Sequence, residues 1–328
     1  MSNLTYSLKT QAARLRKIFF ILCGIICAIN LKAAADWTAK TSGTTKDLHS
    51  VFFATEDIGW VSGADGTILR TTNAGTDWTA QTSSAAVALK TIAFKNYAIG
   101  VAAGENGTIV RTTDGGTTWA AVNSGVAFTL NKLFWISDNV WAVGNSGTIL
   151  KSTDSGATWA SGASTAPTTN HLKSVYFINS STGWACGVNT ILRTSDGGSS
   201  WSKFTDAISA TDIFFVDVST GWFTDDTGGS GFIWTSNDSG VSWTLKKSTT
   251  SSLNSLYFIN PSTGWAAGIG GTIMITTDNG KSFQSDISSG SANFSSIFIS
   301  TGGTGFVAGA SGAIFKRTAP IRVPEVST

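Results

Sequence analysis

The stretch Gly107-Thr108-Ile109-Val110-Arg111-Thr112-Thr113-Asp114-Gly115-Gly116-Thr117-Thr118-Trp119 decides the fold. A short apolar run leads into Thr-Thr-Asp-Gly-Gly, and a tryptophan follows a few residues later. An Asp side chain bonds backbone N–H groups two residues on, and Gly accepts the positive φ that ends such a turn. The stretch therefore predicts two β-strands joined by a tight turn, with Trp119 as a large apolar anchor that starts the return strand.

The same pattern occurs six times along the chain, and its anchoring aromatics are spaced by 41, 40, 42, 42 and 40 residues. A period of roughly 40–45 residues with four short strands per unit is typical of a β-propeller. The repeats run over residues 66–78, 107–119, 147–159, 189–201, 231–243 and 271–283. The residues expected to clasp the turns are Asn73, Asp114, Asp154, Asp196, Asp238 and Asp278.

The two ends of the repeat region complement each other. Trp37 lies 41 residues before Trp78 without a turn signature ahead of it, whereas the last repeat, Phe294 to Arg317, lacks a fourth strand. We therefore expect an all-β, seven-bladed propeller over residues 36–318, in which residues 36–41 complete the last blade and Trp37 lies beside Phe315. Closure of the ring removes the sheet edge that invites aggregation.

The first 35 residues differ from the rest in composition. Four basic residues precede the apolar run 18–31, and Ala33-Ala34-Ala35 resembles a cleavage site, which is the layout of a secretory signal peptide. An uncleaved membrane anchor is the alternative, although the run is shorter than the ~20 residues that a span needs. Residues 319–328, with Pro320 and Pro324, are expected to form a flexible tail.

Removal of residues 1–35 takes away five positive charges, so the formal net charge of +2 becomes −3. The basic character therefore belongs to the export signal and gives no argument for nucleic acid. Of three cysteines only Cys186 remains, which excludes a disulfide framework and a cysteine-based metal site in the mature chain. Calcium is not expected either, because each Asp of the repeats is alone in its turn and calcium takes six to eight oxygen ligands.

The complete repeat, Gly-Trp-Ala-x-Gly-x-x-Gly-Thr-Ile-Leu-Arg-Thr-x-Asp-Gly-Gly-x-x-Trp, resembles that of the photosystem II stability/assembly factor family and its non-photosynthetic relatives. Its turn is the Asp-box, which also occurs in sialidases, other glycosidases and sortilin-like receptors. The resemblance implies a propeller that binds a protein partner outside the cytoplasm, without catalysis or cofactor. In a photosynthetic source the implied partner is a photosystem II subunit or assembly intermediate in the thylakoid lumen; otherwise the place is periplasmic or extracellular. We expect a monomer that is at most peripheral to a membrane.

A basic residue precedes the Asp-box in five blades that are neighbours around a closed ring. We name them the basic arc, and we expect it to dock an acidic or carboxylate-bearing partner segment through bidentate contacts of its Arg side chains. The alternative is that each side chain pairs locally with a turn carbonyl or a neighbouring carboxylate. Trp234 and Ile275 replace the basic residue in the fifth and sixth blades. The basic arc consists of Arg70, Arg111, Lys151, Arg193 and Lys316.

A carbohydrate-active or carbohydrate-binding propeller is the other reading of an Asp-box chain. The mature sequence has few Tyr and Glu residues for a sialidase-like site, but a pair of aspartates can serve a glycosidase. His49 and His171 begin inner strands without a partner motif and are expected to be structural. Asp225 and Asp226 lie in an insertion on the face opposite the Asp-boxes, as a solvated loop or as a cation or glycan contact. The candidate carboxylates of the fifth blade are Asp212, Asp217, Asp225 and Asp226.

Overall fold

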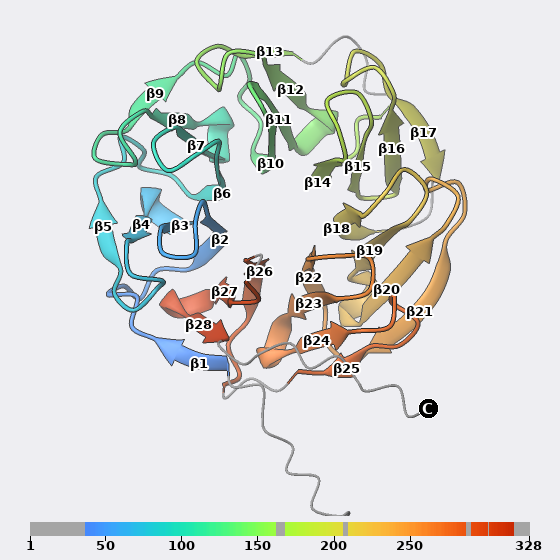
Figure 1. Ribbon diagram of the computed structural model, residues 1–328. Coiled ribbons are helices and arrows are strands. Elements are labelled where there is room, and N and C mark those ends of the chain that lie inside the picture. Colours follow the sequence, from blue (N-terminus) through green and yellow to red (C-terminus); the bar gives the residue numbers. More distant parts are fainter. Residues whose placement is uncertain (1–36, 162–167, 206–208, 287–289, 301, 318–328) are drawn as a thin grey trace, which may run out of the picture. The chain divides into compact units, whose positions relative to one another are not determined.

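The computed structural model describes residues 37–161, 168–205, 209–286, 290–300 and 302–317. Within them, seven antiparallel four-stranded sheets form the blades of a propeller, as predicted. Figure 1 shows the blades in chain order around a common axis. The expected signal peptide and tail lie outside the described residues. None of the described helical turns is long and apolar enough to cross a membrane.

Each blade begins with the strand nearest the axis and continues outward through three antiparallel neighbours (Figure 1). The inner strands are β2 (Leu48–Phe53), β6 (Leu89–Phe94), β10 (Leu130–Ile136), β14 (Leu172–Phe177), β18 (Ala210–Phe215), β22 (Leu253–Phe258) and β26 (Phe294–Ile299). The second strands are β3 (Gly59–Gly63), β7 (Gly100–Gly104), β11 (Asn139–Gly144), β15 (Gly183–Gly187), β19 (Gly221–Asp225), β23 (Gly264–Gly268) and β27 (Gly305–Gly309).

The outer half of each blade consists of the third strand, the Asp-box turn and the outermost strand. The third strands are β4 (Ile68–Thr71), β8 (Ile109–Thr112), β12 (Ile149–Ser152), β16 (Thr190–Thr194), β20 (Gly231–Ser236), β24 (Ile273–Thr276) and β28 (Ile314–Arg317). The outermost strands are β5 (Thr79–Gln81), β9 (Ala120–Val122), β13 (Ala160–Ser161), β17 (Ser202–Thr205), β21 (Thr244–Thr249), β25 (Gln284–Ser285) and β1 (Trp37–Lys40). The 3-10 turns η1 (Ala64–Gly66), η2 (Glu105–Gly107), η3 (Asn145–Gly147), η4 (Thr227–Gly229), η5 (Ile269–Gly271) and η6 (Ala310–Gly312) join second to third strands at the end opposite the Asp-boxes.

Aromatic stacking joins neighbouring blades. A Trp of the second strand stacks on the aromatic residue near the end of the next blade's inner strand, as Trp60 does on Phe94 at 3.6 Å between ring centroids. Trp141 and Trp184 do the same with Phe177 and Phe215. Such pairs contribute about 0.5–1.5 kcal/mol beyond the burial of their area. The Gly-Trp pattern of the sequence therefore holds the ring together between blades rather than within one.

The ring closes through β1, as predicted. β1 pairs with β28, but Trp37 lies opposite Arg317, and Ala39 rather than Trp37 lies opposite Phe315. The expected position of Trp37 was thus wrong by two residues, although Trp37 and Phe315 belong to one apolar cluster. The observed register matches blade one, where Thr79, the residue after Trp78, lies opposite Arg70. β1 comes from the other end of the chain, but it pairs with β28 in the same register as β5, which follows β4 directly in sequence, pairs with β4.

A buried polar cluster supports this closure. The seventh blade has no Asp-box carbonyl for the Trp265 indole, and the carboxylate of Asp286 is the acceptor in its place. The Oδ2 atom of Asp286 accepts hydrogen bonds from the Nε1 atoms of Trp37 and Trp265, at 3.1 and 3.0 Å. The Nε atom of Arg317 lies 3.3 Å from the same oxygen, and both charged side chains are 4% exposed. We name Trp37, Trp265, Asp286 and Arg317 the closure cluster.

Candidate functional site

The Asp-box turn is a closed network of hydrogen bonds. In the second blade, the Thr112 hydroxyl donates to Asp114 Oδ1 at 2.8 Å and accepts from the Gly116 backbone N–H at 2.9 Å. Asp114 also accepts from the backbone N–H and the hydroxyl of Thr118, at 2.9 and 2.7 Å. Gly115 and Gly116 have φ of +72° and +94°, a region that glycine enters without steric cost.

These hydrogen bonds favour the ionised carboxylate. The backbone and side-chain groups of Thr118 lower the pKa of Asp114 to about 2. Side-chain and backbone bonds from Thr158, Ser200 and Ser242 lower the pKa of Asp154, Asp196 and Asp238 to about 2 in the same way. Asn73 replaces the acid in blade one and still accepts the equivalent backbone N–H, from Asp77 at 3.0 Å. The Asp-box residues therefore act as turn clasps, whether charged or neutral.

The anchoring tryptophans pack between blades, as expected. Trp78, Trp119 and Trp201 are less than a tenth exposed. Each meets the inner-strand aromatic of its own blade edge-on, for example Phe94 against Trp119 at 5.8 Å, and belongs to an apolar cluster with residues of the preceding blade. The faces of these three rings are therefore covered, and they do not form a platform for sugar rings. No group of three or more His, Cys, Asp or Glu side chains is placed to hold a metal ion in the described part of the chain.

Three members of the basic arc donate to carbonyl groups of the next blade's Asp-box turn. Arg111 Nε donates to the Ser155 carbonyl at 2.8 Å. Lys151 Nζ donates to the Gly197 carbonyl at 2.9 Å, and Lys316 Nζ donates to the Ala74 carbonyl at 2.7 Å across the ring closure. These contacts match the local alternative that the sequence left open. They also place the three cations at the Asp-box end of the propeller.

Arg70 and Arg193 differ from these three residues. Each guanidinium lies over the ring of a second-strand tryptophan, Trp60 or Trp184, with 5.8 Å from Cζ to the ring centroid in both cases. Lys151 lies over Trp141 in the same way, so the difference is in hydrogen bonding. Among the described residues, neither guanidinium has an ion-pair partner, and the buried Nε atoms of both lack a hydrogen-bond partner. Trp60 and Trp184 donate to the Asp-box carbonyls of Gly115 and Ser239, as Trp141 does to that of Gly197. Arg70 and Arg193 are thus pre-oriented cations whose hydrogen-bonding capacity is not used by the described fold.

A second polar feature lies inside the ring and was not predicted. The third residue of each of the seven inner strands carries a polar group, and hydrogen bonds from these residues link neighbouring blades. Leu133 N donates to Thr91 Oγ1 at 3.0 Å, and Val51 N donates to Ser296 Oγ at 3.2 Å. We name this set the polar layer: Ser50, Thr91, Lys132, Ser174, Asp212, Ser255 and Ser296.

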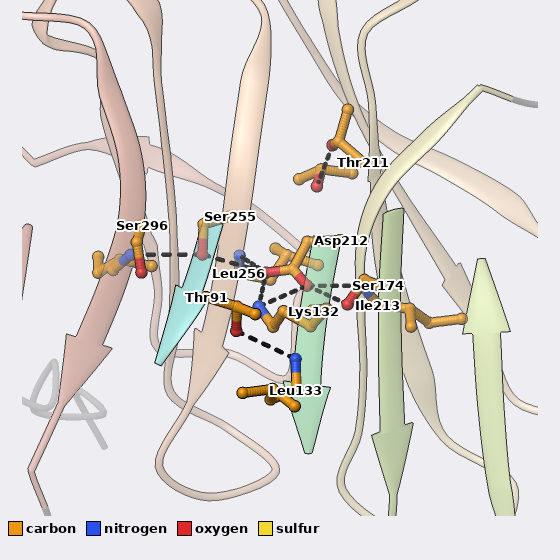
Figure 2. Close-up of polar contacts among 12 residues, drawn as sticks. Thr91, Lys132, Leu133, Ser174, Thr211, Asp212, Ile213, Ser255, Leu256 and Ser296 are labelled. Carbon is orange, nitrogen blue, oxygen red and sulfur yellow. Dashed lines mark hydrogen bonds and ion pairs between the residues drawn. The ribbon is translucent and has the colours of Figure 1, made fainter. Parts of the chain in front are cut away.

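Lys132 and Asp212 are the two charged members of the polar layer, and they reach past the fourth blade to meet at 3.2 Å. Figure 2 shows Asp212 at the centre of this network. Its carboxylate also accepts from the hydroxyls of Ser174 and Ser255 and from Leu256 N, at 2.5, 3.0 and 2.9 Å. A buried carboxylate is stable when it is paired and hydrogen-bonded in this way. Alignment of the inner strands would have shown the opposite charges at equivalent positions, but not that they touch.

A family model described as photosynthesis system II assembly factor YCF48 matches residues 29–126, 83–165, 123–193 and 246–318. These matches cover well over half of the chain. The chain belongs to the YCF48 family. No curated protein matches it at a significant level.

Two solved YCF48 structures are similar to this chain. One, described as YCF48 bound to D1 peptide, has 20% identity and a TM-score of 0.70, and the alignment covers 86% of this chain and 97% of that one. The other, YCF48 from Cyanidioschyzon merolae, has 21% identity and a TM-score of 0.70, covering 86% and 98%. A WD40 propeller domain of Doa1 is similar at 11% identity with a TM-score of 0.69, covering 85% and 96%. At these identities the structures support the shared fold.

In this YCF48-family chain, the remaining carboxylates of the fifth blade are already engaged by neighbours. Asp217 accepts from the backbone N–H groups of Ser219 and Thr220, and Asp225 accepts from Thr227 N and Oγ1. Asp226 lies 3.4 Å from Lys173. Together with the buried Asp212, these side chains serve separate local contacts. The structure does not bring them together as a pair of catalytic carboxylates.

The two histidines also make local contacts. His171 Nδ1 accepts from Ser146 N at 3.1 Å. His49 lies 3.4 Å from Lys90 Nζ, and burial, followed by the Lys90 charge, lowers its pKa. Both contacts lie near the inner-strand ends opposite the Asp-boxes, which agrees with the structural role expected from the sequence.

Proposed function

We propose that this chain is an exported, monomeric, non-enzymatic scaffold of the assembly-factor kind that binds a protein partner through the Asp-box face of its propeller. Residues 1–35 would serve as the signal peptide that directs it to the periplasm, the cell exterior or, in a photosynthetic source, the thylakoid lumen. A photosystem II subunit or assembly intermediate is the partner class that the family suggests. The related YCF48 structure with a D1 peptide supports a polypeptide ligand.

The proposal rests on the hydrogen-bonding capacity of Arg70 and Arg193, which the described fold does not use. Arg111, Lys151 and Lys316 donate hydrogen bonds to turn carbonyls. Arg70 and Arg193 lie over tryptophan rings and donate to no turn carbonyl. A guanidinium presents its donors in a planar fork that fits a carboxylate with two parallel hydrogen bonds. We therefore assign the two arginines to direct contact with an acidic or carboxylate-bearing partner segment. The other three cations hold the turns and add positive potential.

The test is capture of the partner from detergent-solubilised membranes by the immobilised mature chain. The double variant Arg70→Gln/Arg193→Gln should lose the captured protein, because glutamine keeps a polar side chain but removes the charge and the fork. A matched variant, Lys246→Gln/Lys281→Gln, removes two exposed cations outside the basic arc and should capture normally. Undiminished capture by the arginine variant would refute the proposed role of the arc. N-terminal sequencing of the chain recovered from its source tests the predicted cleavage after Ala35.

A further inference from the structure

The strand that closes the ring, β1, begins two residues after the predicted cleavage site. Cleavage after Ala35 makes Asp36 the first residue of the mature chain and Trp37 the second. β1 consists of residues 37–40, so it is formed by the second to the fifth residue of the mature chain. Removal of the signal peptide and closure of the ring therefore involve the same short segment.

The closed ring encloses the side chain of Trp37. This side chain is 1% exposed, and its Nε1 atom donates to Asp286 Oδ2 at 3.1 Å. A Cβ atom on Gly305 of β27 would lie 2.8 Å from the indole, so the indole packs directly against the backbone of that strand. Trp37 also belongs to one apolar cluster with Phe315 of β28. It cannot leave this site unless the closure cluster opens.

The backbone of β1 is held as well, but only by contacts within the sheet. All four of its residues pair with β28, and the Thr38 hydroxyl donates to the Lys316 carbonyl at 3.3 Å. In the other six blades an Asp-box turn joins the third strand to the outermost strand, whereas β1 is joined to its own sheet by non-covalent contacts alone. Detachment of β1 therefore leaves β26, β27 and β28 continuous in sequence, and it is a local opening that costs less than unfolding of the whole ring.

A signal peptidase competes with the ring for this segment. A peptidase holds residues on both sides of the bond that it cleaves extended in its own cleft, and these residues cannot be paired elsewhere at the same time. Cleavage of a folded chain therefore proceeds through an opened form, and its rate follows the population of that form. In the closed ring, the second residue after the bond is Trp37, one of the largest fully buried side chains of the described fold.

We propose that closure of the ring and removal of residues 1–35 exclude each other, so that the signal peptide is removed while β1 is unpaired and the ring closes afterwards. This inference rests on the proposed function, which includes cleavage after Ala35. A precursor that closes its ring first is protected by the closure cluster and keeps residues 1–35 until β1 detaches from β28.

Cleavage of the refolded full-length precursor by purified signal peptidase tests the proposal. The experiment compares the unmodified precursor with one that carries the spacer Gly-Ser-Gly-Ser-Gly-Ser between Asp36 and Trp37. A flexible spacer of this length spans about 13 Å, so it moves the scissile bond away from β1 and leaves every residue of the ring in place. We expect the unmodified precursor to be cleaved at least about tenfold more slowly than the spacer precursor, because only its opened form is a substrate. Gel electrophoresis and mass spectrometry measure the rate and the site of cleavage.

Two substitutions in the unmodified precursor separate local opening from unfolding of the whole ring. Asp286→Ala removes the acceptor of Trp37 and should raise the cleavage rate at least about tenfold, because it frees β1. Lys132→Met is the matched control, because it also breaks a buried ion pair, but on inner strand β10 of the third blade. It should leave the cleavage rate unchanged, and equal acceleration by the two substitutions would contradict the role of β1. Tryptophan fluorescence verifies that each variant is folded before the assay, and the spacer comparison does not depend on either substitution.

The outcomes distinguish this inference from the proposed function. Equal cleavage rates for the unmodified and the spacer precursor overturn the inference and leave the predicted signal peptide in place. Failure of the peptidase to cleave the spacer precursor after Ala35 refutes the predicted signal peptide, and the inference fails with it. Rapid cleavage of the spacer precursor after Ala35, together with slow cleavage of the unmodified one, is the result that the proposal requires.

Discussion

Replacement of Asp286 by Ala tests how the ring is held closed. The Asp286 carboxylate joins β1, the sixth blade and β28, because one of its oxygens accepts from Trp37 and Trp265 and faces Arg317. In the alanine variant the Arg317 guanidinium, 4% exposed, loses this carboxylate in a site that excludes water. Removal of one partner from a buried ion pair costs about 3–5 kcal/mol. The two indole N–H groups lose an acceptor as well, but these costs are not additive because they share one oxygen.

Guanidinium chloride unfolding followed by tryptophan fluorescence measures this loss. With a denaturant slope of about 5–6 kcal/mol per M, a loss of 3–5 kcal/mol shifts the midpoint down by roughly 0.5–1 M. Hydrogen exchange should show β1 and β28 losing protection before the other blades. The control is Asp65→Asn, which breaks an exposed pair with Lys46 and costs less than about 1 kcal/mol. A midpoint for Asp286→Ala that equals that of the control would refute the role of the closure cluster.

Three further predictions concern the clasps, the channel and a turn glycine. The folded pKa of Asp114, Asp154 and Asp196 is lowered from 3.8 to about 2, so the stability that they contribute is complete above pH 3.8 and is lost as the pH falls through 2. Melting temperatures measured against pH should show this loss in acid. Replacement of these Asp residues by Asn should reduce the pH dependence, because Asn does not titrate and Asn73 already serves as the clasp in blade one. Lys132→Met should destabilise by about 3–5 kcal/mol, because it leaves the Asp212 carboxylate, 4% exposed, without its cation; a denaturant midpoint equal to that of the unmodified chain would contradict this. Gly280→Ala should lower the melting temperature, because a Cβ at this position would lie 2.3 Å from Trp222 Nε1 at a φ of +70°; Gly228→Ala, with a similar φ and open space, separates the clash from the backbone strain.

The repeat period and the missing final strand were sufficient to predict the ring, because each blade is a local unit whose strands pair with sequence neighbours. The Asp-box clasp could be predicted as well, since all its partners lie within six residues of Thr112. Contacts between blades could not be predicted from the sequence. The hydrogen bond of Arg111 to the Ser155 carbonyl crosses 44 residues, and Lys132 and Asp212 are 80 residues apart.

The closure cluster shows the same limit. Asp286 follows the last Asp-box as one more polar residue in a Ser-rich linker, and nothing in its neighbours indicates burial. Its role depends on the seventh blade lacking an Asp-box, so that Trp265 needs another acceptor. The register of β1 also required coordinates, because the sequence aligned Trp37 with Trp78 without saying which residue of β28 it faces. The repeat alone therefore predicts the strands of each blade, but not the side-chain contacts and the strand register between blades and at the ring closure.

The most direct measurement of the central claim is the affinity of the purified partner for the Arg70→Gln/Arg193→Gln variant. Each charge-assisted hydrogen bond contributes about 1.5–3 kcal/mol, so the loss of two arginine forks should weaken binding by at least about 100-fold. The fold should stay intact, because in the described residues these guanidiniums hold no turn carbonyl. Surface plasmon resonance with the Lys246→Gln/Lys281→Gln control gives the comparison. The account predicts a loss confined to the arginine variant; an affinity within about twofold of the unmodified chain would contradict it.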